Sequence, residues 1–227
     1  MGKDGTIFPV QTSFEFKLLR GMMENLLEGI PSDSLNKKGL SWDHPPLAWN
    51  PLVTSGIQVQ TAAKVDYFRS PKGDHVSDNG HFLWTSWKGD FLARGLVRPT
   101  FQSTYDSGVL MVRENEQNWA KLCFEKTDFG TTAAVSVVTR GYSDDANGAD
   151  IDATELWLQA ARVGDLFAFH YSLDGKNWRM VRFFRLEMQA EVKVGLVAQC
   201  PAGSGTTIDF LHFSIGPMSL KSIRTGT

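Results

Sequence analysis

Cysteine is scarce in this sequence, and neither sign of charge is in surplus. The 227 residues include two cysteines, Cys123 and Cys200, and no Asn-x-Ser/Thr glycosylation acceptor. Two cysteines are too few for the disulfide framework of a small secreted protein. Lysine and arginine number 23 against 25 aspartates and glutamates, so the formal net charge is -2 at pH 7. Without a basic surplus to neutralise phosphates, we expect neither nucleic acid nor an anionic membrane surface as a partner.

Long apolar runs are also missing. No stretch approaches the roughly 20 apolar residues that span a membrane, and residues 1–10 lack the apolar segment of a signal peptide. Together with the scarce cysteines, these absences predict a cytoplasmic protein. The paired Cys and His of a zinc site, a glycine-rich phosphate loop and a Gly-x-Ser-x-Gly elbow are absent as well. We therefore expect no metal and no cofactor.

The chain does contain a series of turn signals between strand-like segments. The motifs Asp78-Asn79-Gly80-His81 and Ser172-Leu173-Asp174-Gly175 are typical of tight turns, and in the second motif Gly175 supplies a positive φ. From residue 40 onward, short apolar or alternating runs are separated by Gly, Pro, Asn and Asp. This pattern predicts eleven strands, at residues 57–61, 81–87, 91–101, 108–113, 119–125, 132–140, 155–162, 166–172, 179–186, 192–199 and 207–215.

Eleven strands in a chain of this length need two packed sheets. No internal repeat of fixed period is visible, which argues against a propeller or a solenoid. The predicted fold is therefore an all-β two-sheet sandwich that forms one main domain.

A different pattern precedes the strands. Residues 14–27 place apolar side chains at helical spacing, and Gly29 and Pro31 supply a stop. This amphipathic helix either caps an open end of the sandwich or contacts a partner protein. We accordingly divide the chain into an N-terminal extension with this helix and a linker (1–39), the sandwich (40–217) and a C-terminal tail (218–227).

Alternation along residues 119–125 sorts the side chains between the two faces of a sheet. Ala120, Leu122 and Phe124 form an apolar set, which predicts the core face. The opposite set combines an aromatic ring, an ammonium group and a carboxylate: Trp119, Lys121, Cys123 and Glu125. A ring beside charged hydrogen-bonding groups suits a ligand-binding surface, and the same set also suits a solvated outer face.

A second candidate group surrounds His81. The turn that begins at Asp78 places His81 at the head of a strand that contains Trp84, and Asp66 and Arg69 lie shortly before it in the chain. A histidine beside acidic and basic neighbours can act as a general acid or base near neutral pH. The alternative interpretation is structural, because the polar side chains of such a turn commonly hydrogen-bond its backbone.

Several motifs, taken in order, resemble those of one family. They are Trp42 with Pro45-Pro46 and Trp49, Asp66-Tyr67-Phe68-Arg69, Asp78-Asn79-Gly80-His81, Gly108-Val109-Leu110-Met111-Val112-Arg113, Asn118-Trp119-Ala120-Lys121, Glu125, Tyr142-Ser143-Asp144, the Ser-Leu-Asp-Gly-x-x-Trp turn and Gly195 through Cys200-Pro201. Over about residues 40–215, the chain resembles the uncharacterised-domain family that includes the yeast regulation-of-enolase protein. That family is similar to concanavalin A-like lectins and glucanases. The resemblance therefore implies a jelly roll with a concave, ligand-facing surface.

The chain departs from this family's pattern at three positions. Phe68 and Asp145 stand where the family usually has Trp, and Ser107 stands where it usually has Gln. The resemblance implies no established catalytic mechanism, and residues 1–39 lie outside it.

An acidic segment invites comparison with glycosidases. Asp150-Ile151-Asp152-Ala153-Thr154-Glu155 superficially resembles the acidic strand motif of concanavalin-like glucanases. Its first position is Asp instead of Glu, and it follows the turn-rich residues 143–149, so we interpret the match as coincidental. Calcium is a weaker alternative still, because the spacing of the loop acids does not fit an EF-hand and such acids are usually hydrated.

We hypothesise that the protein binds a small molecule or a carbohydrate in a concave-face pocket. The proposed ligand-binding residues are Asp66, Arg69, His81, Trp84, Trp119, Lys121 and Glu125. One alternative is a cofactor-independent isomerase, cyclase or lyase, in which Glu125 or His81 moves a proton while Lys121 or Arg69 stabilises negative charge. Another is a regulatory protein that binds a metabolic enzyme through the N-terminal helix. A closed cavity that contains Lys121, Glu125 and His81 favours the enzyme, and a shallow groove lined by Trp favours the binding protein.

Overall fold

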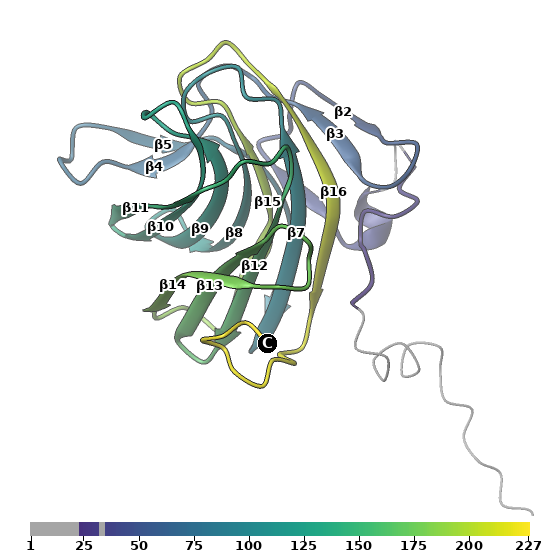
Figure 1. Ribbon diagram of the computed structural model, residues 1–227, viewed down its shortest axis with the longest axis vertical. Helices are drawn as coiled ribbons and strands as arrows, with labels where there is room; N and C mark the ends of the chain where they lie inside the picture. Colours follow the sequence, from purple (N-terminus) through teal and green to yellow (C-terminus); the bar gives the residue numbers. More distant parts are fainter. Residues whose placement is uncertain (1–22, 32–34) are drawn as a thin grey trace, which may run out of the picture.

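The computed structural model describes residues 23–31 and 35–227 and arranges most of them in two stacked antiparallel sheets (Figure 1). The first sheet has seven strands, in the spatial order β1 (Ser41–Asp43), β6 (His81–Lys88), β15 (Glu191–Gln199), β8 (Ser107–Asn115), β9 (Asn118–Lys126), β10 (Thr132–Arg140) and β11 (Tyr142–Asp150). The second sheet also has seven, in the order β14 (Arg179–Arg185), β13 (Leu166–Ser172), β12 (Leu156–Val163), β7 (Phe91–Pro99), β16 (Thr207–Gly216), β3 (Ile57–Gln60) and β2 (Ala48–Pro51). The predicted all-β sandwich is therefore confirmed.

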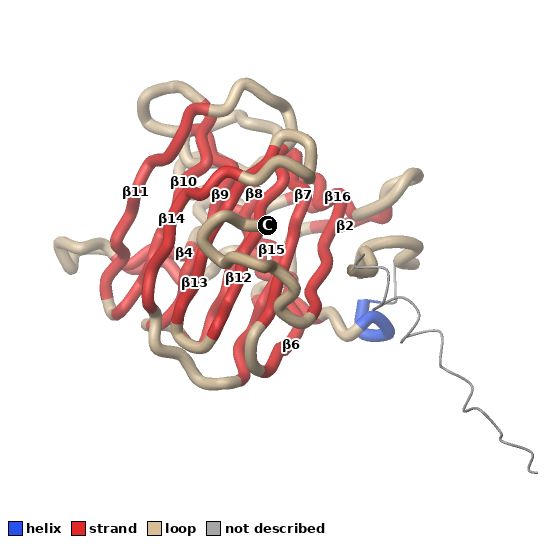
Figure 2. The backbone as a smooth tube through the Cα atoms, turned by 60° about the horizontal axis from the view of Figure 1, so that its bottom comes forward, coloured by secondary structure: helices blue, strands red, loops and turns tan. Residues whose placement is uncertain are grey.

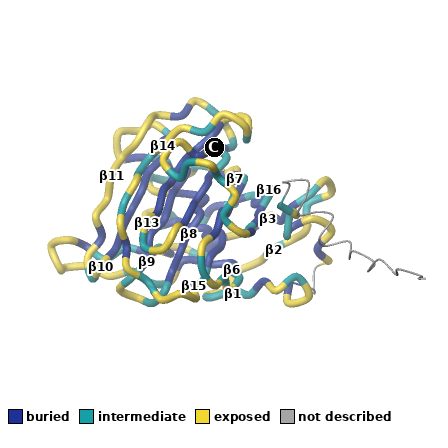
Figure 3. The backbone as a smooth tube through the Cα atoms, turned by 90° about the horizontal axis from the view of Figure 1, so that it is seen from below, coloured by how far each residue is buried: buried dark blue, intermediate teal, exposed yellow. Residues whose placement is uncertain are grey.

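The main core lies between the two sheets, and the strands bury alternate residues in it. On β9, the inward-facing Ala120, Leu122 and Phe124 are fully buried, as the alternation predicted. Phe124 packs edge to face on Phe101, with ring centroids 5.0 Å apart. The sheets approach so closely that a Cβ atom on Gly108 would lie 2.8 Å from Cβ of Val97. Figure 3 shows this burial as dark blue strands at the centre, with exposed loops around them.

Each of the eleven predicted strands matches an observed strand with ends within two residues. Five observed strands were not predicted. Four of them, β1, β2, β4 (Tyr67–Arg69) and β5 (Val76–Asp78), have only three or four residues, too few to show a repeating pattern.

The fifth, β11, corrects the interpretation of residues 143–149 as turn-rich. Among the described strands it pairs with β10 alone, as an edge strand, and all of its residues except Ser143 are exposed. An edge strand with a solvated surface needs no apolar alternation, and polar side chains protect such an edge from pairing with other chains. Its polar composition therefore gave no strand signal.

The predicted helix over residues 14–27 lies mostly outside the described residues. Its described end, residues 23–27, is not helical, and residues 26–29 form a turn in which Gly29 has a φ of 62°. Leu27 is nonetheless fully buried in the main core. The helix that the structure does describe is the 3₁₀ helix η1 (Leu35–Lys38), shown in blue in Figure 2. No helix in the described part of the chain is long and apolar enough to cross a membrane.

The predicted C-terminal tail packs on the outer face of the second sheet. Nε2 of His170 lies 3.1 Å from the carbonyl oxygen of Arg224, and the Gln159 amide donates to the carbonyl oxygen of Gly226 at 3.3 Å. Gly226 has a φ of 77°, and a Cβ atom there would lie 2.8 Å from the His170 ring. The tail thereby satisfies two fully buried polar side chains of the sheet.

The hairpin of β4 and β5 covers part of the outer face of the first sheet, the face turned away from the main core (Figure 1). Tyr67 of β4 is fully buried there, and its ring packs edge to face on Phe82 and on Trp119, with centroid distances of 6.3 Å in both pairs. A second, smaller apolar cluster forms beneath the hairpin. The same cover encloses a polar cavity.

Candidate functional site

Strand register brings polar side chains from several strands together on the outer face of the first sheet. Lys121 on β9 pairs with Val137 on β10, which pairs with Asp145 on β11, so these three lie in one row across the sheet. In a second row, Gln199 on β15 pairs with Ser107 on β8, which pairs with Glu125 on β9. Lys121 and Glu125 share a face because they are four residues apart, about 13 Å along a strand.

A cavity of about 350 Å³ opens between this face and the hairpin. Its lining residues are Asp66, Phe68, His75, Tyr105, Lys121, Glu125, Val137, Asp145, Gln199, Pro201 and Ala202. Pairing of Val65 with Cys200 holds the start of the hairpin against the end of β15, and this places Asp66 beside Gln199. The cavity therefore joins residues from opposite parts of the chain.

Lys121 is the anchoring cation of the cavity. Its ammonium group is 3 % exposed and donates to Asp66 Oδ1 at 3.1 Å, to the Tyr67 carbonyl oxygen at 2.7 Å and to Gln199 Oε1 at 3.2 Å. The Gln199 amide in turn donates to Asp66 Oδ1 at 2.6 Å. Burial alone would lower the pKa of Lys121, but the nearby carboxyl groups, Asp66 foremost, raise it. The ammonium stays charged, and three acceptors engage its three donors.

Glu125 has the opposite character, because its carboxyl group is buried without a partner. The residue is 9 % exposed, and no group among the described residues hydrogen-bonds its carboxyl oxygens. Burial raises the pKa of Glu125 from its ordinary value of 4.5 to about 8, with Lys121 lowering it and Asp145 raising it. Glu125 is therefore mostly protonated at neutral pH, and a protonated carboxyl can both donate and accept a hydrogen bond.

The mouth of the cavity carries an aromatic residue in an unusual backbone conformation. Tyr105 has a φ of 68°, which is uncommon for a residue other than glycine, and it is 41 % exposed. Its backbone N–H donates to the Lys126 carbonyl oxygen at 2.7 Å, which ties this loop to the end of β9. Asp145 also borders the mouth, and burial is the main cause that raises the pKa of its carboxyl group. Backbone strain of this kind is concentrated at functional sites in proteins.

Four of the seven residues expected to bind a ligand do not line this cavity. His81 is one of them: its Nδ1 lies 2.7 Å from the His44 carbonyl oxygen, and its Nε2 accepts a hydrogen bond from the Ala62 backbone N–H at 2.9 Å. Burial lowers the pKa of His81, which favours the neutral ring. Both ring nitrogens therefore have structural partners.

Trp119 differs from the exposed platform that the sequence suggested. It is 1 % exposed beneath Tyr67, and its indole N–H donates to the Glu116 carbonyl oxygen at 3.2 Å. The alternation placed Trp119 on the correct face of the sheet, but the hairpin covers it. Its ring cannot stack on a ligand without displacement of Tyr67.

Trp84 and Arg69 also have structural partners. The Trp84 indole N–H donates to Asp43 Oδ1 at 2.9 Å, and the Lys193 ammonium lies 4.1 Å from the centre of the Trp84 ring. Arg69 Nε donates to the Gly141 carbonyl oxygen at 2.8 Å, which fastens the hairpin to the turn between β10 and β11. Asp66, Lys121 and Glu125 are the expected residues that the structure brings together.

Several lining residues were not among the expected ligand-binding residues. Two of them stand at positions where the sequence departs from the pattern of the resembled family. Phe68 and Asp145, which depart from the pattern of the resembled family, both line the cavity. The third departure, Ser107, is fully buried, is paired with Glu125 across the strands, and has a hydroxyl group without a hydrogen-bond partner. All three departures thus fall at this site. Gln199, Tyr105 and His75 gave no such signal.

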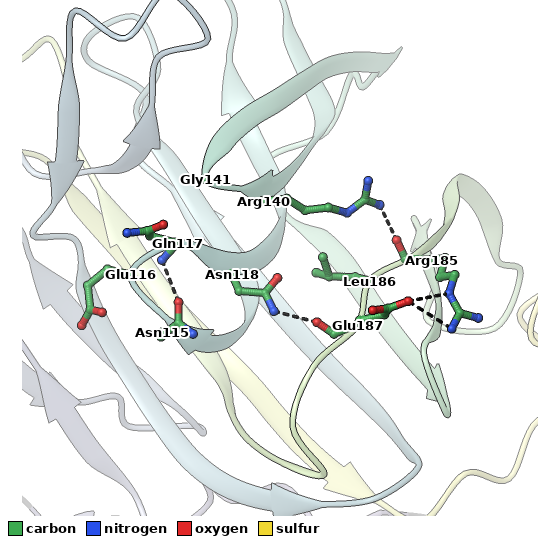
Figure 4. A pocket seen from close by; sticks show the side chains of 9 residues that line it. All are labelled: Asn115, Glu116, Gln117, Asn118, Arg140, Gly141, Arg185, Leu186 and Glu187. Carbon is green, nitrogen blue, oxygen red and sulfur yellow. Dashed lines mark hydrogen bonds and ion pairs between the residues drawn. The ribbon is translucent and has the colours of Figure 1, made fainter.

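A second, larger cleft lies at another place on the sandwich (Figure 4). It has a volume of about 960 Å³ and is lined by Asn115, Glu116, Gln117, Asn118, Arg140, Gly141, Arg185, Leu186 and Glu187. Its polar side chains are exposed or half-buried, and several bond to one another: Asn118 donates to the Glu187 carbonyl oxygen at 2.7 Å, and Arg140 donates to that of Arg185. None of the expected site residues lines it. We therefore take the smaller cavity as the candidate site.

The acidic segment at residues 150–155, which begins at the last residue of β11, lines neither cavity. Asp150 ends β11 and accepts a hydrogen bond from the Thr131 hydroxyl at 2.9 Å, and Asp152 lies exposed in the following loop. Among the described residues, no group of three or more His, Cys, Asp and Glu side chains is arranged to hold a metal ion.

Comparison with known proteins gives consistent results. A family model described as "Protein of unknown function (DUF1349)" matches residues 42–218. Regulation of enolase protein 1 from Saccharomyces cerevisiae is 28 % identical over 160 residues, which cover 70 % of this chain and 80 % of the yeast protein.

Two solved structures illustrate the likeness of fold. A functionally unknown protein from Saccharomyces cerevisiae aligns with a TM-score of 0.75 at 26 % identity, covering 80 % of this chain and 98 % of that one. The GH43 protein BlXynB from Bacillus licheniformis, as a variant, aligns with a TM-score of 0.63 at 14 % identity, covering 80 % of this chain and 37 % of that one. The second likeness is one of fold alone.

Proposed function

The chain belongs to the DUF1349 family, as its motifs predicted, and we propose that it binds a small polar ligand of the carbohydrate class in the cavity beneath the hairpin of β4 and β5. The observation that carries the proposal is the Glu125 carboxyl group. It is more than nine-tenths buried, lines the cavity and has no hydrogen-bond partner among the described residues. Because Glu125 borders the cavity, its carboxyl group is free to hydrogen-bond a ligand there.

The chemistry of the walls agrees with a small, hydroxylated ligand. Carboxyl groups stand beside the apolar side chains of Phe68 and Val137, and the Tyr105 ring lies at the mouth. Hydroxyl groups of a sugar both donate and accept hydrogen bonds, and the apolar face of a sugar packs on aromatic rings. A cavity of about 350 Å³ is near the lower limit for pockets that bind small molecules. We expect a ligand about the size of a monosaccharide.

A screen of mono- and disaccharides by thermal shift tests this proposal. A true ligand should raise the melting temperature of the wild-type protein and should have little effect on Glu125→Gln, since that variant keeps the size but loses the acid. Asp152→Asn is the matched control, because Asp152 is an exposed loop acid remote from the cavity lining. A sugar that stabilises all three proteins equally would place binding elsewhere, and a set in which no sugar binds would contradict the proposal.

A second candidate function is cofactor-independent acid–base catalysis. The observation that favours it is a pKa of about 8 for Glu125 beside the charged Lys121, since a carboxyl with a pKa near the working pH is suited to proton transfer. An isomerase, cyclase or lyase reaction would use Glu125 as acid or base. His81 and Arg69 do not line the cavity, so Lys121 is the remaining group to stabilise negative charge. Turnover of a metabolite that survives in Glu125→Gln would exclude this role.

A protein partner is the third candidate, and its support is the printed name of the yeast relative. The apolar stripe expected to contact a partner lies at residues 14–27, mostly outside the described residues. Calorimetric titration of the full chain with an enolase tests it, and Glu125→Gln should then bind as the wild type does. For all three candidates we propose the cytoplasm as the location, supported by two buried cysteines that form no disulfide.

A further inference from the structure

The polar groups of the cavity differ in how many of their hydrogen-bond donors and acceptors are already engaged. Lys121 is the basic side chain deepest in the cavity, and all three of its donors are engaged. Its charge is balanced by Asp66, with Nζ and Oδ1 3.1 Å apart. An anionic group of a ligand would therefore have to displace Asp66 or Gln199 to reach the ammonium. Lys121 thus serves as a structural cation and gives the cavity little affinity for anions.

The groups that are still free to form hydrogen bonds are carboxyl oxygens, which accept them. Among the described residues, no group hydrogen-bonds the Glu125 carboxyl or Oδ2 of Asp66, and none forms an ion pair with Asp145. With Asp66 and Lys121 paired to each other, Asp145 and the mostly protonated Glu125 are left without an ion pair among the described residues, although Lys121 lowers the pKa of both. Both groups line the cavity, but they stand in different rows of the sheet: Glu125 on β9 pairs with Ala133, and Asp145 on β11 pairs with Val137, next to Lys121.

An aromatic side chain completes the arrangement at the mouth. Tyr105 is 41 % exposed, borders the same cavity, and is held by a loop whose backbone bonds to the end of β9. The face of an aromatic ring attracts a cation, most strongly where water is partly excluded. Carboxyl groups that form no ion pair with the described residues, next to an accessible ring, are an environment that suits ammonium groups.

We propose that the ligand of this cavity is cationic, a protonated amine carried on a small polar skeleton such as an amino sugar, and that its ammonium group bonds to the Glu125 carboxylate while Asp145 adds negative charge to the same cavity. This inference rests on the binding function proposed above and deepens it by naming the chemical class. The buried and unpartnered Glu125 carboxyl is the observation that points to a ligand, and the engagement of Lys121 is the observation that decides its charge.

Proton linkage follows from the same arrangement. The titratable and charged groups around Glu125 are Lys121, Asp66, Asp145, Asp128, Tyr105 and His75. In the free protein burial raises the pKa of Glu125 to about 8, whereas an ammonium group bonded to it would lower that pKa. Binding of the cation at neutral pH must then release a proton, so its affinity increases as the pH rises toward about 8.

Three sugars that share one ring test the charge of the ligand: glucosamine, glucose and glucuronate. Their affinities are to be measured by NMR titration of the full chain at about pH 7.5, where much of the glucosamine amine is still charged and part of Glu125 has lost its proton. We expect glucosamine to bind about tenfold more tightly than glucose, because charge-assisted hydrogen bonds are about twice as strong as neutral ones. Glucuronate should bind most weakly, since the free groups of the cavity are acids.

Variants and outcomes separate the two proposals. Glu125→Gln should remove the preference for glucosamine over glucose and weaken the binding of both sugars, and Asp152→Asn should keep the preference and both affinities. If glucose binds as tightly as glucosamine, or glucuronate binds best, the cationic ligand is excluded while the binding function stands. If none of the three sugars binds, both proposals are contradicted.

Discussion

The two faces of β9 lie on one strand and differ in nearly every physical respect. Toward the second sheet, the strand presents Ala120, Leu122 and Phe124 to a core that is almost entirely apolar. Toward the hairpin it presents Lys121 and Glu125, both buried and both ionisable. The first face follows from the composition of the strand itself, because apolar side chains exclude water. The second is buried because segments distant in the chain fold over it, among them a hairpin more than forty residues earlier.

This contrast shows how the protein separates stability from function. Most of the fold energy comes from the inter-sheet core, where a buried Phe or Leu side chain contributes about 1.5 to 3 kcal/mol. The outer face is covered less completely, and the space left by that incomplete cover is the cavity. Variants on the two faces should accordingly have different consequences for stability and for binding.

The largest effect is expected on the inner face. Phe124→Ala should lower the free energy of unfolding by about 4 kcal/mol, because it removes a ring that is fully buried and packed on Phe101. Urea denaturation followed by fluorescence measures the loss. Phe129→Ala is the matched control, since Phe129 is 79 % exposed in the turn after β9 and should change stability by less than about 0.5 kcal/mol. Equal losses in the two variants would contradict the packing described for Phe124.

A slightly smaller loss is expected from the charged pair of the outer face. Lys121→Ala should cost about 3 kcal/mol, because it leaves the Asp66 carboxylate and Gln199 without their cation in a covered site. The double variant Lys121→Met with Asp66→Asn should recover part of that loss, since it removes both charges at once. Lys126→Ala, on the same strand but half-buried, is the control. If the double variant were less stable than Lys121→Ala, the loss of the ion pair itself would cost more stability than leaving the Asp66 carboxylate unpaired.

The contrast between the faces also explains what could be predicted from the sequence. Strands such as Thr132–Arg140 were predicted at their observed bounds because alternation and turn residues are local properties that do not depend on distant contacts. Edge strand β11 was missed for the complementary reason, since it buries almost nothing and its polar sequence resembles a loop.

The site was predictable only in part. Lys121 and Glu125 could be placed on one face by counting residues along the strand, and Asp66 was expected near them. The hairpin cover over Trp119 could not be foreseen, because it depends on tertiary contacts of Tyr67. The partners of His81 are backbone groups of His44 and Ala62, and these contacts could not be predicted because a pattern of side chains does not reveal them.

The two faces of β9 also differ in titration, because the inner-face side chains are apolar whereas Glu125 on the outer face changes charge near neutral pH. The raised pKa of Glu125, about 8 against an ordinary value of 4.5, means that the unfolded chain loses this proton at lower pH than the folded protein. The folded state is therefore penalised increasingly as the pH rises from about 4.5, and the penalty is complete above about 8. Glu125→Gln carries no such penalty.

We thus expect Glu125→Gln to gain about 3 kcal/mol of stability relative to wild type between about pH 5 and about pH 9, an order-of-magnitude value. Urea denaturation at several pH values measures this difference, and Asp152→Asn supplies the baseline for an exposed acid. A difference that stays constant across the range would show that the Glu125 carboxyl titrates normally. The same variants serve in the ligand titrations, so stability and binding are tested on one set of proteins.

The smallest effect is expected from the hydrogen bond that holds the β4–β5 hairpin on the first sheet. Arg69→Ala removes the hydrogen bond from Arg69 Nε to the Gly141 carbonyl oxygen but keeps the backbone bond from Arg69 N–H to the Ser143 hydroxyl at 3.0 Å. Global stability should fall by only about 1 kcal/mol, because the bond is half-buried and the inter-sheet core is untouched. Hydrogen exchange should instead show faster opening of β4 and β5, by about fivefold, with unchanged exchange in β12 and β13.

Arg179→Ala, which changes an exposed arginine at the start of β14, is the control and should leave all four strands unaffected. If Arg69→Ala accelerated exchange equally in both sheets, the hairpin would not be a separate cover, and the cavity could not open for a ligand without unfolding of the sandwich.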